Sequence, residues 1–381
     1  MKQTALYERH RALGARMTPF HGWDMPLYYT SILEEHQAVR NALGVFDVSH
    51  MGQVLVTGSG AVATLNELVV SDISQVGISR ACYTLMLNPQ GGILDDLIIY
   101  RLGTDEFLVI VNCGRHAEDV AWLTAHRQGE ATVTDISEGR SILAVQGPRA
   151  AHVLEQLLDA KVAGLGRFEI APLRTMGPDA CLARTGYTGG DGFEAFLPNK
   201  HAGRLWDAVL AAARLTGGLP VGLGARDTLR IEAGLRLYGA DMDETTTPLE
   251  AGVDWTVAWH KPHFIGKAPL EAQRREGVQR AFVGFELTGA PMPRAGGELW
   301  AVVDGNERVA GRVTSGAFSP LLQKALGMGY VEMACGRPGS ALGLLVRRQR
   351  YTATIVKLPF WRPEQQPGAL TRAPTAESLP G

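Results

Sequence analysis

The sequence GGILDDLIIY at residues 91–100 places two acidic residues in an otherwise apolar run. A short apolar run after a Gly-Gly turn is typical of a buried β-strand. Side chains alternate along a strand, so Asp95 and Asp96 are expected on opposite faces of the sheet. Ionised carboxylates are costly in a core unless they are paired or hydrogen-bonded. Either one Asp faces solvent and the other caps a loop, or one serves a functional cavity, and alternation leaves open which.

More short apolar stretches surround this strand. QVLVTG at 53–58, ACYTLML at 81–87 and EFLVIVN at 106–112 each predict a strand. LNPQGG at 87–92 carries turn residues and predicts a hairpin leading into residues 93–102. Helices are expected at residues 61–70, 116–126, 201–215 and 224–235, and further strands at 141–147, 180–188 and 192–198.

The N-terminal stretch predicts a helix, then a loop at residues 21–29, then a second helix. Ser31 fits the N-cap of that second helix, and Glu34 completes a capping box. Gly44 follows the last turn and is expected to be its C-cap.

Beyond residue 277 the chain becomes strand-rich again, with a DGN turn at residues 304–306. The boundary falls near a charged helical stretch, EAQRREGVQR. We therefore predict the α+β class, with a separate β domain at residues 278–362. Residues 363–381 have little to bury and are expected to be a flexible tail.

The composition excludes several classes of protein. The 381 residues carry 37 Lys and Arg against 39 Asp and Glu, a net charge of −2, which argues against a nucleic-acid binder. No apolar run is long enough to span a membrane, so no membrane association is expected. The 4 cysteines are far apart, which favours free thiols and a cytoplasmic location.

Common nucleotide-binding, zinc-protease and serine-hydrolase motifs are absent from the sequence. His260 and His263 have a spacing that suits a metal, but no carboxylate or thiol set lies near them, so no metal is predicted. Trp255 and Trp259, four residues apart, are interpreted as core packing.

Two further polar residues stand out. Glu194 interrupts an apolar strand and shares a face with Phe196, where its two oxygens suit the donor edge of a 2-amino-4-oxo ring. The alternative is an edge strand with Glu194 in water. Arg226 follows a Gly-rich turn, and it either pairs with a nearby acid, Asp227 or Glu232, or binds an anionic group of a ligand.

These segments together resemble the aminomethyltransferase (T-protein) family of the glycine cleavage system. The resemblance runs from TALYERH to about KLPFW, and the motifs occur in the order found in the family. They are FHGWDMPLYY, GVFDVSHMG, GGILDDLIIY, AVQGP, RTGYTGGDGFE, GLGARDTLRIEAGLRLYGADMDETTTPLEAG and VTSGAFSP.

The resemblance implies a three-domain cloverleaf with a central folate-binding cavity and a C-terminal antiparallel β-barrel-like domain. Residues 1–277 would hold two interleaved α+β domains, with about 52–137 forming most of the second. The implied co-substrate is tetrahydrofolate, and the implied partner is the lipoylated H-protein.

The resemblance also assigns residues. Asp96, the second Asp of the family's motif, is the implied catalytic residue, and Glu194 is the acid implied to grip the pterin ring. Arg226 matches the arginine associated with folate binding. Arg362 is only a candidate, because the tail departs from the family's aromatic ending. The remaining implied pocket residues are Met51, Tyr83 and Tyr187.

The expected reaction transfers the methylene of an S-aminomethyl group on the H-protein's lipoyl arm to folate, with release of ammonia. Asp96 would orient the reacting folate nitrogen and accept its proton without covalent attachment. Two alternatives are a folate-dependent demethylase of the same superfamily and a non-enzymatic folate-binding factor. The second typically carries K-G-C-Y-x-G-Q-E, which the segment around Cys82 lacks.

Overall fold

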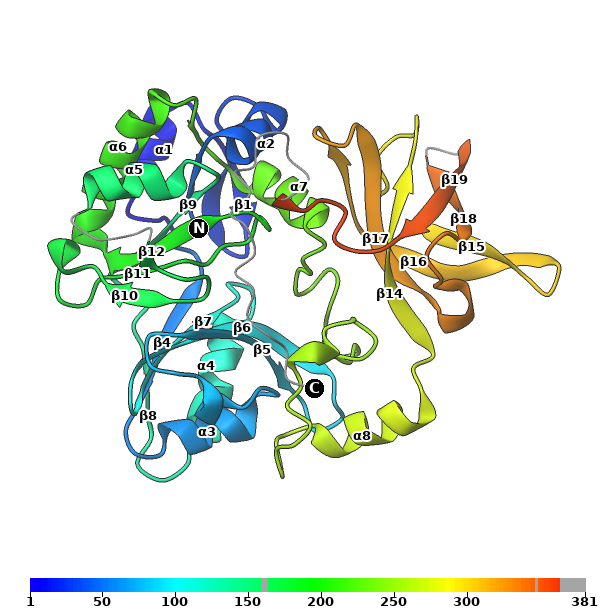
Figure 1. The fold of residues 1–381 in the computed structure, drawn as a ribbon, viewed down its shortest axis with the longest axis horizontal. Helices are drawn as coiled ribbons and strands as arrows, with labels where there is room; N and C mark the ends of the chain where they lie inside the picture. Colours follow the sequence, from blue (N-terminus) through cyan, green and yellow to red (C-terminus); the bar gives the residue numbers. More distant parts are fainter. Residues whose placement is uncertain (159–163, 347–348, 364–381) are drawn as a thin grey trace, which may run out of the picture.

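The computed structural model describes residues 1–158, 164–346 and 349–363. Figure 1 shows three lobes around a common centre, two built on open β-sheets and one on a closed β-barrel. Helix α7 (Leu223–Glu232) lies at that centre and contacts both β2 (Trp23–Tyr28) and the barrel strand β16 (Asn306–Ser319). The predicted α+β class, the three-lobed arrangement and the C-terminal barrel are confirmed. The division of the chain at residue 277 stays a prediction, and residues 364–381 of the expected tail lie outside the described residues.

The first lobe contains a six-stranded sheet whose strands are antiparallel except for the β13–β3 pair. Leu205 and Trp206 of the long helix α6 are buried against this sheet, as the amphipathic pattern predicts. In sheet order the strands are β10 (Ile170–Pro172), β11 (Cys181–Ala183), β12 (Gly192–Pro198), β9 (Arg140–Gln146), β3 (Gly44–Asp47) and β13 (Leu219–Pro220), and the helices of this lobe are α1 (Tyr7–Ala12), α2 (Ile32–Asn41), α5 (Ala150–Leu157) and α6 (Asn199–Arg214).

The second lobe contains an antiparallel five-stranded sheet, with one face covered by α3 and α4. The predicted hairpin at residues 87–92 joins β5 to β6. The side chain of Asn88 accepts hydrogen bonds from the backbone N–H groups of Gln90 and Gly92, each 2.9 Å long. In sheet order the strands are β5 (Ala81–Leu87), β6 (Ile93–Gly103), β7 (Glu106–Val111), β4 (Gly52–Thr57) and β8 (Thr132–Asp135), and the helices are α3 (Ala61–Leu68) and α4 (His116–Ala125).

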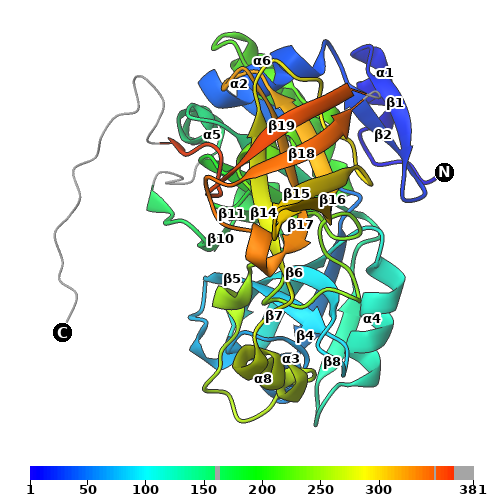
Figure 2. The same cartoon turned by 90° about the vertical axis from the view of Figure 1, so that its right-hand side faces the viewer.

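The third lobe is the closed barrel, and α8 (Lys267–Glu276) leads into it. Figure 2 shows α8 below the barrel, beside the five-stranded lobe. The predicted turn between β15 and β16 holds Asp304 and Gly305 at φ 51° and 79°, as a tight hairpin requires. Around the barrel the strands are β14 (Arg280–Leu287), β17 (Lys324–Glu332), β16 (Asn306–Ser319), β15 (Glu298–Val303), β18 (Ala341–Val346) and β19 (Gln349–Val356).

Two expectations for the N-terminal region are wrong. Residues 21–29, predicted as a loop, contribute β2 (Trp23–Tyr28), which pairs with β1 (Arg16–Phe20) in a hairpin. Ser31 does cap α2, because its Oγ accepts a hydrogen bond from the backbone N–H of Glu34 at 3.2 Å. Gly44, however, is no C-cap: it begins β3, and a Cβ there would lie 2.3 Å from Val39 Cγ2.

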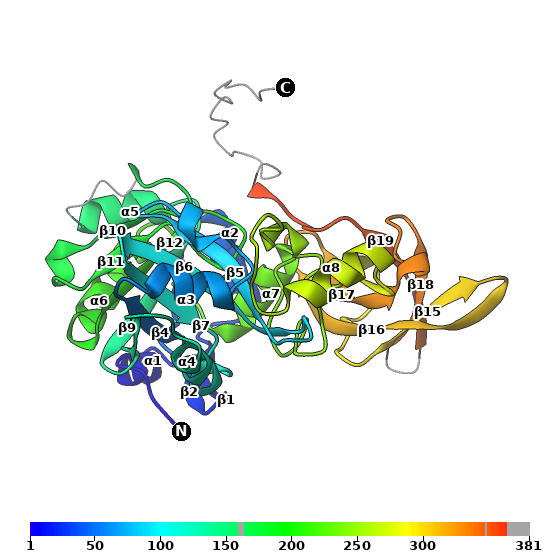
Figure 3. The same cartoon turned by 90° about the horizontal axis from the view of Figure 1, so that it is seen from below.

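The three lobes meet around apolar contacts. One cluster joins the two sheets, with Tyr100 and Leu108 from the second packed with Phe196 from the first. Another joins Ile231 of α7 to Leu326 of the barrel. Viewed from below, in Figure 3, the barrel extends to one side of the two sheet lobes. Within the described residues, no helix is both long and apolar enough to cross a membrane.

Candidate functional site

A cavity of about 1240 Å³ lies where the three lobes meet. Its lining comes from both sheets, from α7 and the loop that follows it, and from the barrel. The structure brings together all six residues singled out from the sequence, although their roles stay predictions. These residues are Met51, Tyr83, Asp96, Tyr187, Glu194 and Arg226.

Asp95 and Asp96 point to opposite faces of β6, as alternation predicts. Asp96 lines the cavity, whereas Asp95 is 0% exposed on the other face. Asp95 accepts hydrogen bonds from the backbone N–H of Asn112 at 2.9 Å and from its side-chain amide at 2.8 Å. Asp95 is thus fully buried and Asp96 is half-buried at the wall of the cavity, which fits the alternative of a carboxylate that serves a functional cavity.

Two hydrogen bonds hold the Asp96 carboxylate in place. Tyr83 donates its hydroxyl to Oδ2 at 3.0 Å, and Asn112 donates Nδ2 to Oδ1 at 2.8 Å. Burial raises the pKa of Asp96 to about 7, and the nearby charge of Asp95 adds to this effect. Asp96 can therefore gain and lose a proton near neutral pH, as a general acid or base must.

Glu194 lies on β12, between β11 and β9. Its alternative placement, in water on an edge strand, is therefore wrong. Its Oε2 accepts a hydrogen bond from Thr185 Oγ1 at 2.6 Å and a longer one from the Tyr100 hydroxyl at 3.4 Å. The described residues donate no hydrogen bond to Oε1. Thr185 and Tyr100 thus fix Oε2 and leave Oε1 for a ligand in the cavity.

Arg226 projects from α7 into the cavity. Its guanidinium lies 4.7 Å from the ring centroid of Tyr187, whose hydroxyl donates to the backbone carbonyl of Arg236. The two carboxylates considered from the sequence have other partners: Asp227 pairs with Arg230, and Glu232 pairs with Arg40 and His36. Among the described residues no carboxylate forms an ion pair with Arg226, although the charge of Glu194 acts on it, and a ligand can provide such a partner. Burial lowers the pKa of Arg226.

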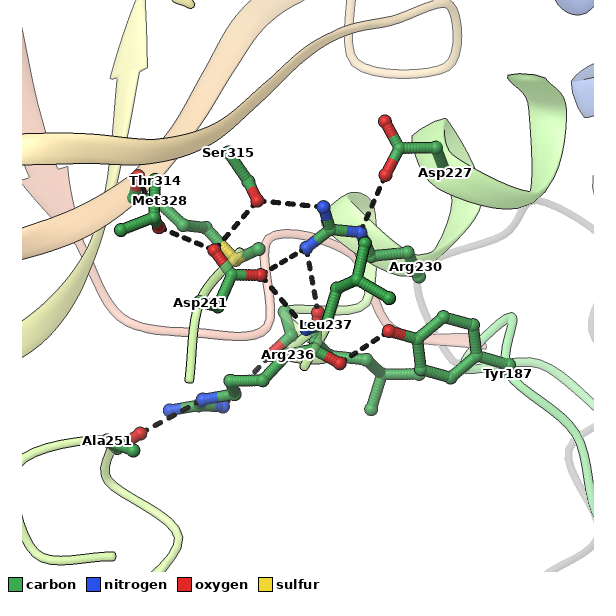
Figure 4. Close-up of polar contacts among 12 residues, drawn as sticks. Tyr187, Asp227, Arg230, Arg236, Leu237, Asp241, Ala251, Thr314, Ser315 and Met328 are labelled. Carbon is green, nitrogen blue, oxygen red and sulfur yellow. Dashed lines mark hydrogen bonds and ion pairs between the residues drawn. The ribbon is translucent and has the colours of Figure 1, made fainter. Parts of the chain in front are cut away.

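Figure 4 shows a buried polar cluster that joins α7 to the barrel beside the cavity. Arg230 NH1 donates to Asp241 Oδ2 at 2.5 Å. Ser315 on β16 accepts from Arg230 NH2 and donates to Asp241 Oδ1, both at 2.7 Å. Leu237 N–H also donates to Asp241, at 3.0 Å. The cluster thus fixes the loop after α7, which lines the cavity, against both α7 and the barrel.

We expect Ser315→Ala to destabilise the protein by about 1–3 kcal/mol, because it leaves two buried charged groups each one hydrogen bond short. The melting temperature, followed by circular dichroism, should fall by a few degrees. Thr352→Ala, at an exposed position of β19, is the control and should melt like the wild type. Equal melting of the Ser315 variant and the wild type would mean that the cluster adds little stability.

The structure adds functional candidates that the sequence reasoning missed. Asn112 holds Asp96, and its only sequence signal is a polar residue at the end of an apolar strand. His50 lines the cavity with Nδ1 unpartnered among the described residues, and burial together with the charge of Arg226 lowers its pKa to about 3. Trp255 corrects a prediction: instead of packing in the core it is 71% exposed at the cavity.

Other sequence candidates lie away from the cavity. His260 and His263 are on the surface, each 2.9 Å from a different acid, Asp72 and Glu67. The described part of the chain holds no group of three His, Cys, Asp or Glu residues that could bind a metal ion. All four cysteines are free. Arg362 does not line the cavity, although the adjacent Pro363 does.

The fold and site define a three-lobed α+β protein with a large central cavity lined by Asp96, Glu194 and Arg226 among apolar side chains. Two family descriptions match it: "GCVT N-terminal domain" over residues 6–261 and "Glycine cleavage T-protein C-terminal barrel domain" over residues 280–361. The chain belongs to the glycine cleavage T-protein family, which confirms the resemblance found in the sequence.

Known proteins are similar to this chain in sequence and structure over nearly its full length. The aminomethyltransferase of Halothermothrix orenii is 42% identical over 94% of this chain and 100% of its own length. That of Thermosynechococcus vestitus is 44% identical, over 95% and 96%. The crystal structure of glycine cleavage system aminomethyltransferase T from Bartonella henselae superposes with a TM-score of 0.88 at 35% identity, over 94% of this chain and 98% of that one.

Proposed function

We propose that this chain is the aminomethyltransferase of a glycine cleavage system. It transfers the methylene of an aminomethyl group, carried on a sulfur of the lipoyl arm of the H-protein, to tetrahydrofolate, releasing ammonia and leaving the lipoyl arm as the reduced dithiol. The observation that carries this proposal is the cavity in which Asp96, Glu194 and Arg226 meet. The four free cysteines accord with our placing the reaction in the cytoplasm.

The groups lining the cavity suit a reduced folate. Glu194 keeps one oxygen free for the N–H donors of the 2-amino-4-oxo edge. The Arg226 guanidinium can donate to an acceptor or anionic group of the ligand. Small-ligand pockets usually measure about 300–1,000 Å³. This cavity, at about 1240 Å³, has room for a folate and the end of a carrier arm.

When bound, the folate supplies the nucleophilic amine that receives the methylene group. Asp96 accepts the proton that this amine loses, because its pKa of about 7 leaves a large carboxylate fraction at neutral pH. Tyr83 and Asn112 fix both oxygens of Asp96, so that the carboxylate is already oriented when the reactants meet. The negative charge also stabilises positive charge that develops beside it.

The direct test of this function supplies tetrahydrofolate together with aminomethylated, lipoylated H-protein and measures methylenetetrahydrofolate and ammonia. We expect both products in equal amounts. H-protein without its lipoyl group is the control and should give neither product. Product formation from a small methyl donor in place of the carrier would instead favour a demethylase.

We also expect Trp255→Ala to raise the KM for the aminomethylated H-protein about tenfold, or ~1.4 kcal/mol. The ring of Trp255 is stacked 5.9 Å from that of Tyr83, and its exposed surface offers apolar contact to an arm that reaches Asp96. The folate Kd should change less than twofold. Trp255→Phe keeps an aromatic ring, so its KM should stay close to the wild-type value. An unchanged KM in the Ala variant would place the arm elsewhere.

A further inference from the structure

Behind Asp96, a chain of hydrogen bonds runs into the interior of the five-stranded lobe. The Nδ2 group of Asn112 lies 2.8 Å from Asp96 Oδ1 and 2.8 Å from Asp95 Oδ1. The backbone N–H of Asn112 also donates to Asp95 Oδ2, at 2.9 Å. Asp95 therefore fixes Asn112 at two points, and Asn112 in turn fixes Asp96.

The chain ends at a third acid, Asp119 on α4. Its side chain lies within hydrogen-bonding reach of Asp95, and the two residues are 1% and 0% exposed. Two carboxyl groups can share a hydrogen bond only if one of them keeps its proton. Asp95 already accepts two bonds from Asn112, whereas Asp119 Oδ2 has no donor among the described residues. Asp119 is therefore the protonated partner.

The electrostatic surroundings agree with this assignment. Burial raises the pKa of Asp119 to about 10, and the charge of Asp95 raises it further. Arg115 acts in the opposite direction but is itself paired with Glu244 at 3.0 Å. At the other end of this chain of hydrogen bonds, Asp96 accepts a hydrogen bond from the Tyr83 hydroxyl. The other titratable groups that face the acid pair are Glu118 and Tyr238.

We propose that Asp119, as a neutral carboxylic acid, is a positioning residue for the aminomethyl transfer: it donates to Asp95, which holds Asn112 against Asp96. The inference rests on the proposed function, because Asp119 acts through Asp96. The proton stays on Asp119 throughout. The hydrogen bond that Asp119 donates stabilises the buried charge of Asp95 and so keeps the Asn112 amide in one orientation.

Substitutions at Asp119 test this role. Asp119→Asn retains a donor without a charge, so we expect its kcat to stay within twofold of the wild type. Asp119→Ala removes the donor, and we expect kcat to fall at least tenfold while the folate Kd stays within threefold. Asp105→Ala, at an exposed position on the turn between β6 and β7 of the same lobe, is the matched control. Equal loss in the Asn and Ala variants would overturn the proposal, and so would normal turnover by Asp119→Ala.

A second measurement needs no substrate. Above pH 5 the unfolded chain has released the Asp119 proton, whereas the native state still holds it. From pH 5 to 8, the unfolding equilibrium constant of the wild type should therefore rise about tenfold per pH unit relative to Asp119→Asn. A ratio that does not vary with pH would show that Asp119 is ionised in the native state and would overturn the proposal.

These results separate the two levels of inference. Absence of methylenetetrahydrofolate and ammonia from the wild-type assay would remove the proposed function, whereas full turnover by Asp96→Asn would remove the role of Asp96 and with it the positioning role. In either case the pH dependence of the unfolding ratio would still identify Asp119 as a neutral acid. Loss of turnover in Asp96→Asn together with normal turnover in Asp119→Ala would leave the proposed function intact and remove only the positioning role.

Discussion

Asp96→Asn should lower kcat at least tenfold, a loss of ~1.4 kcal/mol of transition-state stabilisation, while folate binding stays largely intact. Asn has the shape of Asp, and its Oδ1 can still accept from the Asn112 amide, while its Nδ2 can donate to the Tyr83 hydroxyl, which then accepts; these groups are 2.8 and 3.0 Å from the Asp96 oxygens. It cannot accept a proton at neutral pH. General acid–base groups contribute about 10²–10⁴-fold, which sets the upper end of the expected loss.

The pH dependence of kcat/KM provides the second part of this prediction. Because the carboxylate is the active form and the pKa of Asp96 in the ligand-free protein lies near 7, wild-type kcat/KM should fall as the pH drops below about 7. This acid limb should disappear in Asp96→Asn. Asp105→Asn, on the exposed loop that follows β6, is the control and should keep both rate and pH profile. Full turnover by the Asp96 variant would refute its role.

The acid pair of β6 shows how far the sequence alone could go. Alternation predicted that Asp95 and Asp96 occupy opposite faces, and this is confirmed. Which one faces the cavity is decided by how the lobes pack, and a two-residue period holds no information on that. Asp119 lies next to Asp95 because of how α4 packs on the sheet, and the residue pattern within one strand or helix cannot predict such a contact.

The wrong expectations have related causes. In WDMPLY, Asp24 and Pro26 disfavour a strand. Among the described strands β2 pairs with β1, and an isolated bridge joins Trp23 to Lys2, so β2 lies at the edge of a sheet, where a strand tolerates proline. In β17 glycines interrupt the apolar pattern that would mark a strand, because the fold needs them there: a Cβ at Gly327 would lie 2.2 Å from the Phe285 ring. The exposure of Trp255 follows from tertiary packing, so its spacing from Trp259 was no guide.

Glu194→Ala should weaken folate binding about 100-fold or more, with a smaller effect on kcat at saturating folate. The reason is the loss of hydrogen bonds from the pterin edge to a carboxylate, since a bond to a charged group contributes about 1.5–3 kcal/mol. Thr185 holds Oε2 at 2.6 Å, so the carboxylate is oriented before the ligand arrives and pays little entropy on binding. The folate Kd can be measured by fluorescence or calorimetric titration.

Glu194→Gln sharpens this test, because it keeps the size of the side chain and replaces an acceptor by a donor. An N–H group that faces the N–H donors of the pterin edge leaves both unpaired, so Gln should weaken binding nearly as much as Ala. The control is Glu138→Ala, an exposed glutamate on the segment between β8 and β9, which should leave the titration unchanged. If Glu194→Ala binds folate like the wild type, Glu194 makes no contact with the ligand, and Arg226 becomes the charged group that must anchor it.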